Sequence, residues 1–260
     1  METKCILVEV TEGIGVLKIN RPESLNALNG EVLEEMESAL VGLERDTAVK
    51  VVVVTGAGNK AFVAGGDIKE MLAMDPLAGQ AFGRKGQRVM LLIGKMKKTV
   101  IAAVNGYALG GGLELALACD FIYASDKAKL GLPEVTLGVI PGFGGTQYLA
   151  RLIGPNKAKE LIFSGKILSA QQAKEWGIVN EVFAAEELSA RVMEIAQLIA
   201  RNGMIAVATA KDAIVNGLNM NKEDGLRYES SLFSMLFATE DQKEGMQAFI
   251  AKRKPEFKNK

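Results

Sequence analysis

The sequence has no histidine, only two cysteines and no excess of charge of either sign. The absence of histidine excludes nucleophiles activated by an imidazole and all imidazole acid–base catalysis. Any proton transfer must therefore use Glu, Asp, Lys, Tyr or Cys. The two cysteines, Cys5 and Cys119, are too few for a disulfide framework, and without histidine they do not make the usual zinc sites. These absences predict an intracellular protein that binds no metal.

The 31 Lys and Arg residues equal the 31 Asp and Glu residues in number, so the formal net charge is zero. A neutral chain has no overall electrostatic attraction to nucleic acid or to an anionic membrane surface, which favours a small-molecule partner. The most apolar stretch, residues 100–124, is interrupted by Asn105, Glu114 and Asp120. Residues 1–4 include an acid and do not resemble a signal peptide. We therefore expect a cytoplasmic protein that does not span a membrane.

A chain of 260 residues is long enough for one large domain or for one domain with an appendage. Alternating apolar residues predict a hairpin over 6–19, and buried strands are expected at 51–54 and 100–104 with helical stretches between them. This alternation is typical of the α/β class. In the final third only helical periodicity continues, and four helices are expected there. We therefore expect a core over residues 1–190 and a helical region over 191–260 that packs on another subunit.

Individual residues also predict where several helices begin. Asn29 precedes a helical apolar pattern and has the residue type of an N-cap. Asp67 is expected to cap a following helix rather than to act in catalysis. Further helices are expected near 80–96, over 186–201 and over 240–252.

Two glutamates lie among apolar residues. Glu114 has only apolar neighbours from Leu113 to Ala118, and Glu134 follows Pro133 at the end of an expected strand. Because an unpaired charge in such surroundings is costly, each acid is either paired or functional. With no basic residue close by in the sequence, the pattern suggests a converging pair, in which one carboxylate raises the pKa of the other. The alternative for either acid is a structural hydrogen-bond acceptor.

Three glycine-rich segments, at 65–66, 110–112 and 138–145, are the other candidate functional elements. Glycine lets the backbone approach a ligand closely, so three such turns could direct N–H groups to one oxyanion. The alternative for the segment 110–112 is close packing of a strand against a helix. No dinucleotide fingerprint and no phosphate-binding loop of the G-x-x-x-x-G-K type occurs in the chain.

Taken in order, the motifs of this chain resemble the enoyl-CoA hydratase (crotonase) family from end to end. The similar segments are Asn20-Arg21-Pro22, Leu25-Asn26-Ala27-Leu28, Ala61 to Ile68, Ala102 to Gly106, Gly110 to Glu114, Pro133-Glu134, Gly144-Gly145-Thr146-Gln147 and Ala248 to Arg253. Several motifs in the same order are far more specific than any one of them. The resemblance implies a spiral of ββα units, followed by a C-terminal helical trimerisation region, with trimers commonly paired into hexamers.

The resemblance also implies a reaction, the reversible syn hydration of a short-chain trans-2-enoyl-CoA, such as crotonyl-CoA. The backbone N–H groups of Gly66 and Gly111 would form the oxyanion hole for the thioester carbonyl. Glu114 and Glu134 would hold one water, with Glu114 assisting its attack on C3 and Glu134 delivering a proton to C2. The backbone of Gly142 would contact this water. CoA is part of the substrate, so no separate cofactor is implied.

For the CoA and acyl portions, the family pattern implies contacts from Leu25, Ala27, Ala64, Gly66, Asp67, Ile68, Lys69 and Gly111, and from Phe249 and Lys252 of a neighbouring subunit. Three positions depart from the commonest pattern. Glu23 stands where the family often has Lys, which puts a phosphate contact in doubt. Gly66 stands where Ala is frequent, and Leu132 stands where Gln is frequent before the Pro-Glu pair. The last two changes keep the backbone N–H and the carboxylate.

Other functions remain open on sequence grounds. Isomerases, thioester hydrolases and decarboxylases of this superfamily share the oxyanion hole but generally lack the pair formed by Glu114 and Glu134. An RNA-binding homologue would need a basic helix, for which the candidates are Arg84, Lys85, Arg88, Lys95, Lys97 and Lys98. A catalytically inactive scaffold would have lost a glutamate. Acyl-chain length also stays open, because the residues that could line an acyl pocket could equally be core: Met71, Leu72, Met74, Leu137 and Phe143.

Overall fold

The structure is a computed structural model that describes residues 5–260. The strands are β1 Ile6–Thr11, β2 Ile14–Ile19, β3 Val51–Gly56, β4 Ala61–Ala64, β5 Thr99–Val104, β6 Tyr107–Leu109, β7 Phe121–Ser125, β8 Lys129–Gly131, β9 Ile167–Ser169 and β10 Glu181–Phe183. The α-helices are α1 Gly30–Arg45, α2 Ile68–Met71, α3 Pro76–Lys95, α4 Gly111–Ala118, α5 Gly145–Ile153, α6 Pro155–Ser164, α7 Ala170–Glu175, α8 Leu188–Ala200, α9 Met204–Gly217, α10 Lys222–Leu236 and α11 Glu240–Ile250. Two short 3₁₀ helices lie at Pro22–Ser24 and Glu134–Leu137.

The strands and helices repeat as a ββα spiral. In the pairs β3/β4, β5/β6 and β7/β8, the first strand joins a six-stranded sheet of order β1-β2-β3-β5-β7-β10, and the second joins a four-stranded sheet of order β4-β6-β8-β9. β1 and β2 are antiparallel, whereas the strands from β2 through β10 of the larger sheet pair in parallel. The predicted α/β class and the spiral of ββα units are confirmed.

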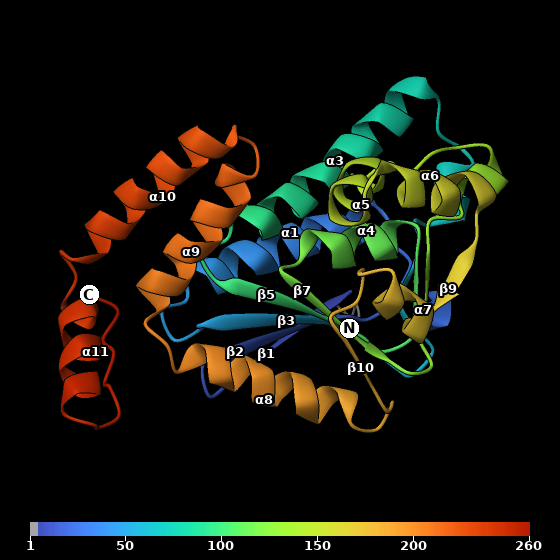
Figure 1. Cartoon of the computed structure of the whole chain (residues 1–260). Coiled ribbons are helices and arrows are strands. Elements are labelled where there is room, and N and C mark those ends of the chain that lie inside the picture. Colours follow the sequence, from blue (N-terminus) through green and yellow to red (C-terminus); the bar gives the residue numbers. More distant parts are fainter. Residues whose placement is uncertain (1–4) are drawn as a thin grey trace.

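Helices cover both faces of the larger sheet (Figure 1). α1 and α3 lie on one face, and their buried residues belong to the main core cluster. α8 lies on the other face, where Leu188, Val192 and Ala196 pack against Val51 and Ile101 of the strands. Because both faces are covered, the parallel strands are apolar without alternation, as Val51 to Val54 show.

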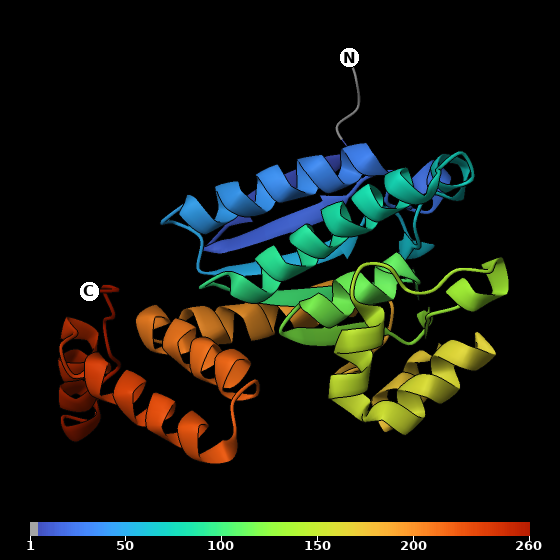
Figure 2. The same ribbon diagram turned by 90° about the horizontal axis from the view of Figure 1, so that it is seen from above.

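The last three helices, α9 to α11, project from one end of the sheet (Figure 2). Their apolar side chains are largely exposed, among them Phe233 at 62% and Phe249 at 85%. The expected division at 190/191 falls inside α8, and within the described residues the chain after Phe183 forms no further strand. The four expected C-terminal helices are confirmed. Among the described residues, no helix is both long enough and apolar enough to cross a membrane.

Most local predictions are confirmed. β1 and β2 form the expected hairpin, and the side chain of Asn29 accepts a hydrogen bond from Val32 N. The helix expected near 80–96 begins earlier, because Asp75 caps it and Pro76 occupies its first turn. The sequence analysis missed β6, a strand of three residues just before the second glycine-rich segment, since Gly106 and Gly110 on either side hide so short a strand.

Candidate active site

The three glycine-rich segments meet at one cavity of about 970 Å³. Gly65 and Gly66 after β4, Gly110 and Gly111 at the start of α4, and Gly142 all line it. These segments converge because β4, β6 and β8 are neighbours in the smaller sheet and run parallel, so their carboxyl ends meet at one edge.

Glu114 lies in this cavity and is 1% exposed. Its Oε1 accepts hydrogen bonds from Phe143 N at 2.8 Å and from Gly145 N at 2.7 Å. Both donors lie at the N-terminus of α5, where backbone N–H groups have no partner within the helix and favour a negative charge. Burial nevertheless dominates and raises the pKa of Glu114 to about 7, with the nearby Glu134 raising it further and the two amides opposing the rise.

Glu134 lines the same cavity from the short 3₁₀ helix after β8. Both of its carboxylate oxygens are buried, and neither has a hydrogen-bond partner among the described residues. Burial raises the pKa of Glu134 above its ordinary value. A buried carboxylate without a partner is costly, so its neutral form is favoured until a donor or a water enters the cavity.

The trans geometry of two peptide groups directs two N–H groups toward this cavity. Gly65 O accepts a hydrogen bond from Leu28 N at 2.9 Å, and in a trans peptide the next N–H, that of Gly66, points the opposite way. Gly110 O likewise accepts from Glu114 N at 3.0 Å, so the N–H of Gly111 points out of the start of α4. Gly110 has φ 51°, a conformation that favours glycine. Gly66 and Gly111 both line the cavity.

An apolar wall completes the cavity. Phe82 and Phe143 form an edge-to-face pair with ring centroids 5.2 Å apart. Gly86 on α3 makes room for the Phe143 ring, because a Cβ there would lie 2.1 Å from Cδ1 of that ring. Phe143 thus joins the apolar wall to Glu114, which its amide contacts.

Of the five apolar residues proposed for an acyl pocket, four line the cavity: Met71, Met74, Leu137 and Phe143. Leu72 is not among the lining residues and is 87% exposed. Phe82 and Ile140 also line the cavity, and the sequence analysis missed both. Phe82 could have been found from its helical spacing to Gly86, Val89 and Ile93, which form the buried face of α3.

The residues proposed to contact CoA fall into separate places. Ala64, Gly66, Ile68 and Gly111 line the cavity. Asp67 does not line it, because the Asp67 side chain caps α2 by accepting from Lys69 N, as the sequence predicts.

The remaining proposed CoA residues lie outside the cavity lining. Leu25 and Ala27 belong to the segment that pairs with residues 64–67, and Lys69 is exposed beside it. Phe249 lies in α11 and Lys252 follows this helix, and neither residue lines the cavity. The single chain therefore does not bring these last two residues to the site.

A second hollow of about 790 Å³ lies beyond the C-terminal end of α3. Lys98, Lys211 and Glu44 are among the residues that line it. Lys98 donates to Leu43 O and Asp46 O, and Lys211 forms an ion pair of 2.9 Å with Asp120. The partly buried ammonium groups of these lysines bind carbonyl groups and form an ion pair, so we do not assign a reaction to this hollow.

Three of the six basic residues considered for RNA binding, Lys85, Arg88 and Lys98, contact other groups of the protein. Lys85 pairs with Glu34 at 2.6 Å, and Arg88 pairs with Glu37 at 3.4 Å. Lys98 donates to two backbone carbonyl groups.

Comparisons with known proteins agree on one family. Residues 9–260 match the family model described as enoyl-CoA hydratase/isomerase. The chain is 46% identical to a crotonyl-CoA hydratase of Syntrophomonas wolfei over 98% of both chains, and 46% identical to a short-chain-enoyl-CoA hydratase of Clostridium acetobutylicum over 100% of both. The crystal structure of an enoyl-CoA hydratase from Bacillus anthracis superposes with a TM-score of 0.96 at 43% identity, covering 98% of this chain and 100% of that one.

Proposed function

The chain belongs to the enoyl-CoA hydratase/isomerase family, and from this premise we propose that it catalyses the reversible syn hydration of short-chain trans-2-enoyl-CoA thioesters, such as crotonyl-CoA, to 3-hydroxyacyl-CoA. Two relatives that match it over nearly their whole length carry the names of hydratases for such substrates. The reaction is that of a hydro-lyase.

The observation that carries this proposal is the different bonding of the two carboxyl groups in one cavity. Glu114 accepts hydrogen bonds from two backbone N–H groups, whereas both oxygens of Glu134 are buried and have no partner among residues 5–260. A water bound between them would supply the missing partner to Glu134. Two carboxyl groups with raised pKa values near one water are suited to acid–base chemistry near neutral pH.

In the proposed reaction the thioester carbonyl accepts hydrogen bonds from the N–H groups of Gly66 and Gly111. These donors stabilise the negative charge that grows on the carbonyl oxygen as C3 is attacked. Glu114 accepts a hydrogen bond from the water, whose oxygen bonds to C3 while the C2–C3 π bond breaks. Glu134 donates a proton to C2 on the same face, and the proton lost by the water returns to the carboxyl pair. One water is thereby added, and the reverse reaction uses the same groups.

We further propose that CoA binds across the segments 25–28 and 64–69, and that Phe249 and Lys252 come from a neighbouring subunit. The exposed apolar side chains of α9 to α11 support an oligomerisation role for residues 191–260, as a homotrimer or a dimer of trimers. Gly142 lines the cavity, and its backbone would contact the bound water. The mechanism uses only carboxyl groups, backbone N–H groups and water, and CoA enters as part of the substrate.

The direct test is the loss of enoyl ultraviolet absorbance when the purified protein is mixed with crotonyl-CoA and, separately, with enoyl-CoA esters of increasing chain length. We expect rapid loss with crotonyl-CoA and slower loss as the chain grows. If no ester loses absorbance while a 3-enoyl-CoA is converted to its 2-enoyl isomer, the hydratase proposal is wrong and the isomerase alternative takes its place.

A further inference from the structure

The N–H group of Gly66 owes its direction to a segment far away in the sequence. Residues 25–28 run beside residues 64–67, and Leu28 forms a parallel bridge with Gly66. Three backbone hydrogen bonds join the two segments: Ala64 N to Leu25 O at 3.1 Å, Leu28 N to Gly65 O at 2.9 Å, and Asp67 N to Leu28 O at 2.8 Å. Because Leu28 N fixes the carbonyl of the Gly65–Gly66 peptide, it also fixes the opposite N–H.

The segment 25–28 does not have a conformation that would hold itself in place. Leu25 and Asn26 have φ values of 51° and 59°, in the left-handed region that costs energy for residues other than glycine. Asn26 is fully buried, and its side chain anchors this turn by accepting from Arg21 N and donating to Ala61 O. The turn therefore depends on contacts with other segments.

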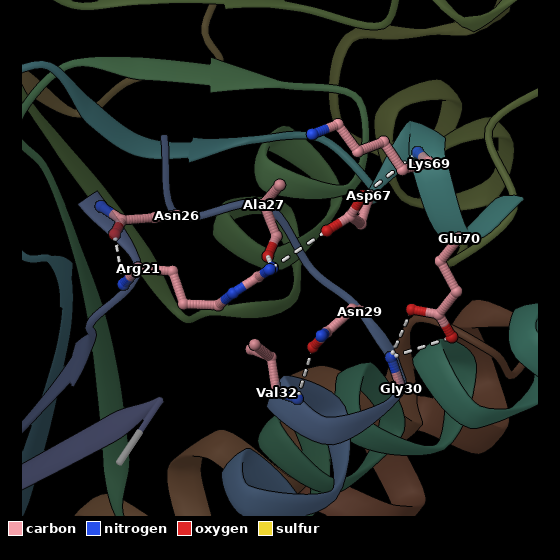
Figure 3. Close-up of polar contacts among 9 residues, drawn as sticks. All are labelled: Arg21, Asn26, Ala27, Asn29, Gly30, Val32, Asp67, Lys69 and Glu70. Carbon is pink, nitrogen blue, oxygen red and sulfur yellow. Dashed lines mark hydrogen bonds and ion pairs between the residues drawn. The ribbon is translucent and has the colours of Figure 1, made fainter. Parts of the chain in front are cut away.

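The Arg21 side chain connects both segments (Figure 3). One guanidinium nitrogen donates to Ala27 O at 2.7 Å, and the other donates to Asp67 Oδ2 at 3.1 Å. Both side chains of the ion pair are only 18% exposed. The other oxygen of Asp67 accepts from Lys69 N, so Asp67 is held from two sides. The guanidinium of arginine holds its N–H donors in one rigid plane and so fixes the two acceptors relative to each other, whereas the single ammonium nitrogen of a lysine gives a less defined geometry.

We propose that Arg21 is a positioning residue for the oxyanion hole. By joining Ala27 O to Asp67, it keeps Leu28 N on Gly65 O and so directs the Gly66 N–H toward the thioester carbonyl. This inference rests on the proposed function, in which that N–H binds the carbonyl. Arg21 does not line the cavity, so it acts on the substrate only through the peptide that it aligns.

The test compares Arg21→Met, Arg21→Lys and Asp67→Asn with the parent. Arg191→Met serves as the matched control, because it removes a guanidinium from an exposed ion pair on α8. Two readouts are used: kcat and KM for crotonyl-CoA, and the infrared carbonyl stretch of bound butyryl-CoA labelled with ¹³C at the thioester carbon. The saturated thioester cannot be hydrated, so its spectrum reports the oxyanion hole without turnover.

We expect Arg21→Met to lower kcat about 10- to 100-fold with less than a threefold change in KM, since a misdirected donor chiefly weakens transition-state binding. The carbonyl stretch should lie at lower frequency in the parent complex than in free butyryl-CoA, and this shift should shrink in Arg21→Met. Asp67→Asn keeps the cap oxygen and should show a smaller effect in the same direction. Arg21→Lys should lie between the parent and Arg21→Met, and Arg191→Met should match the parent.

A folded Arg21→Met variant with the parent's carbonyl frequency and kcat would overturn the inference and leave the hydratase proposal intact. If the parent shifts the carbonyl and Arg21→Met does not, but neither protein hydrates any enoyl-CoA, the positioning role stands and the hydratase proposal fails. A parent that binds butyryl-CoA without any carbonyl shift would overturn the positioning role, because no oxyanion hole would then exist.

Discussion

The two hollows at the ends of α3 are similar in volume, about 970 and 790 Å³, but opposite in chemistry. In the smaller hollow, one oxygen of Glu44 accepts from Lys97 N and the other lacks a partner among residues 5–260, while Lys211 donates to Asp120 and to two carbonyl groups. In the larger hollow, neither oxygen of Glu134 has a partner within the described part of the chain. Volume alone does not identify a site. A buried carboxyl group without a partner at either oxygen is a stronger indication, because its burial costs free energy that no hydrogen bond offsets.

The largest expected difference between the two hollows is the effect of a carboxyl-to-amide substitution on turnover. Glu114→Gln and Glu134→Gln should each lower kcat for crotonyl-CoA about 1000-fold, because each removes a proton acceptor or donor from the reaction. Glu44→Gln makes the same change in the other hollow and should leave kcat within twofold of the parent. Initial rates of absorbance loss measure all three variants. Equal losses in Glu44→Gln and Glu134→Gln would remove the distinction between the two hollows.

The pH dependence of stability offers the next largest effect. The native pKa of Glu114 is about 7 against an ordinary 4.5, so the group contributes stability below about pH 4.5 and loses that contribution as the pH rises through 7. The loss is on the order of 3 kcal/mol. Glu114→Gln cannot ionise and should gain stability relative to the parent by about this amount between pH 4.5 and 8. Urea unfolding at a series of pH values, at one protein concentration, measures the difference. Parallel curves for the two proteins would contradict a raised pKa.

A smaller effect is expected at the ion pair of the second hollow. Lys211→Met leaves the carboxylate of Asp120, whose side chain is 19% exposed, without its cation and should cost about 2 kcal/mol of unfolding free energy. Because this pair lies at the other end of α3, kcat should not change. Unfolding curves and initial rates on the same preparations test both statements. A large fall in kcat with intact stability would show that the second hollow takes part in the chemistry.

The smallest effects come from two glycines on one helix. Gly86→Ala would bring a Cβ to 2.1 Å from the Phe143 ring and should lower the free energy of unfolding by about 1–2 kcal/mol. It should also lower kcat, because Phe143 N donates to Glu114 and a displaced ring would move this donor. A Cβ at position 94 would have no atom within 4 Å, so Gly94→Ala should raise the free energy of unfolding by up to about 1 kcal/mol through helix propensity. Thermal unfolding and initial rates separate the two variants. If Gly86→Ala were as active as the parent, the ring would not be needed to align Glu114.

Much of this site could be predicted from the sequence, because buried acids and glycine-rich turns stand out against apolar neighbours. Glu114 was noticeable since all its neighbours are apolar, and Asp67 was correctly expected to cap a helix. The sequence could not show that Glu114 has hydrogen-bond donors and Glu134 has none among the described residues. The donors to Glu114, the amides of Phe143 and Gly145, lie 29 and 31 residues further along the chain. The ion pair between Arg21 and Asp67 could not be predicted for the same reason, since Asp67 lies 46 residues further along the chain. Patterns along a chain show which residues are unusual, whereas their partners depend on how the sheet brings distant loops together.

We propose that Glu114 and Glu134 add water to one face of the substrate. The stereochemistry of hydration in D2O tests this most directly. Crotonyl-CoA is converted by the parent protein, and the proton NMR coupling between the hydrogens on C2 and C3 of the product is measured. We expect a single product in which one deuterium on C2 and the hydroxyl on C3 have been added to the same face. A product with the deuterium on the opposite face, or an equal mixture of the two, would contradict this proposal.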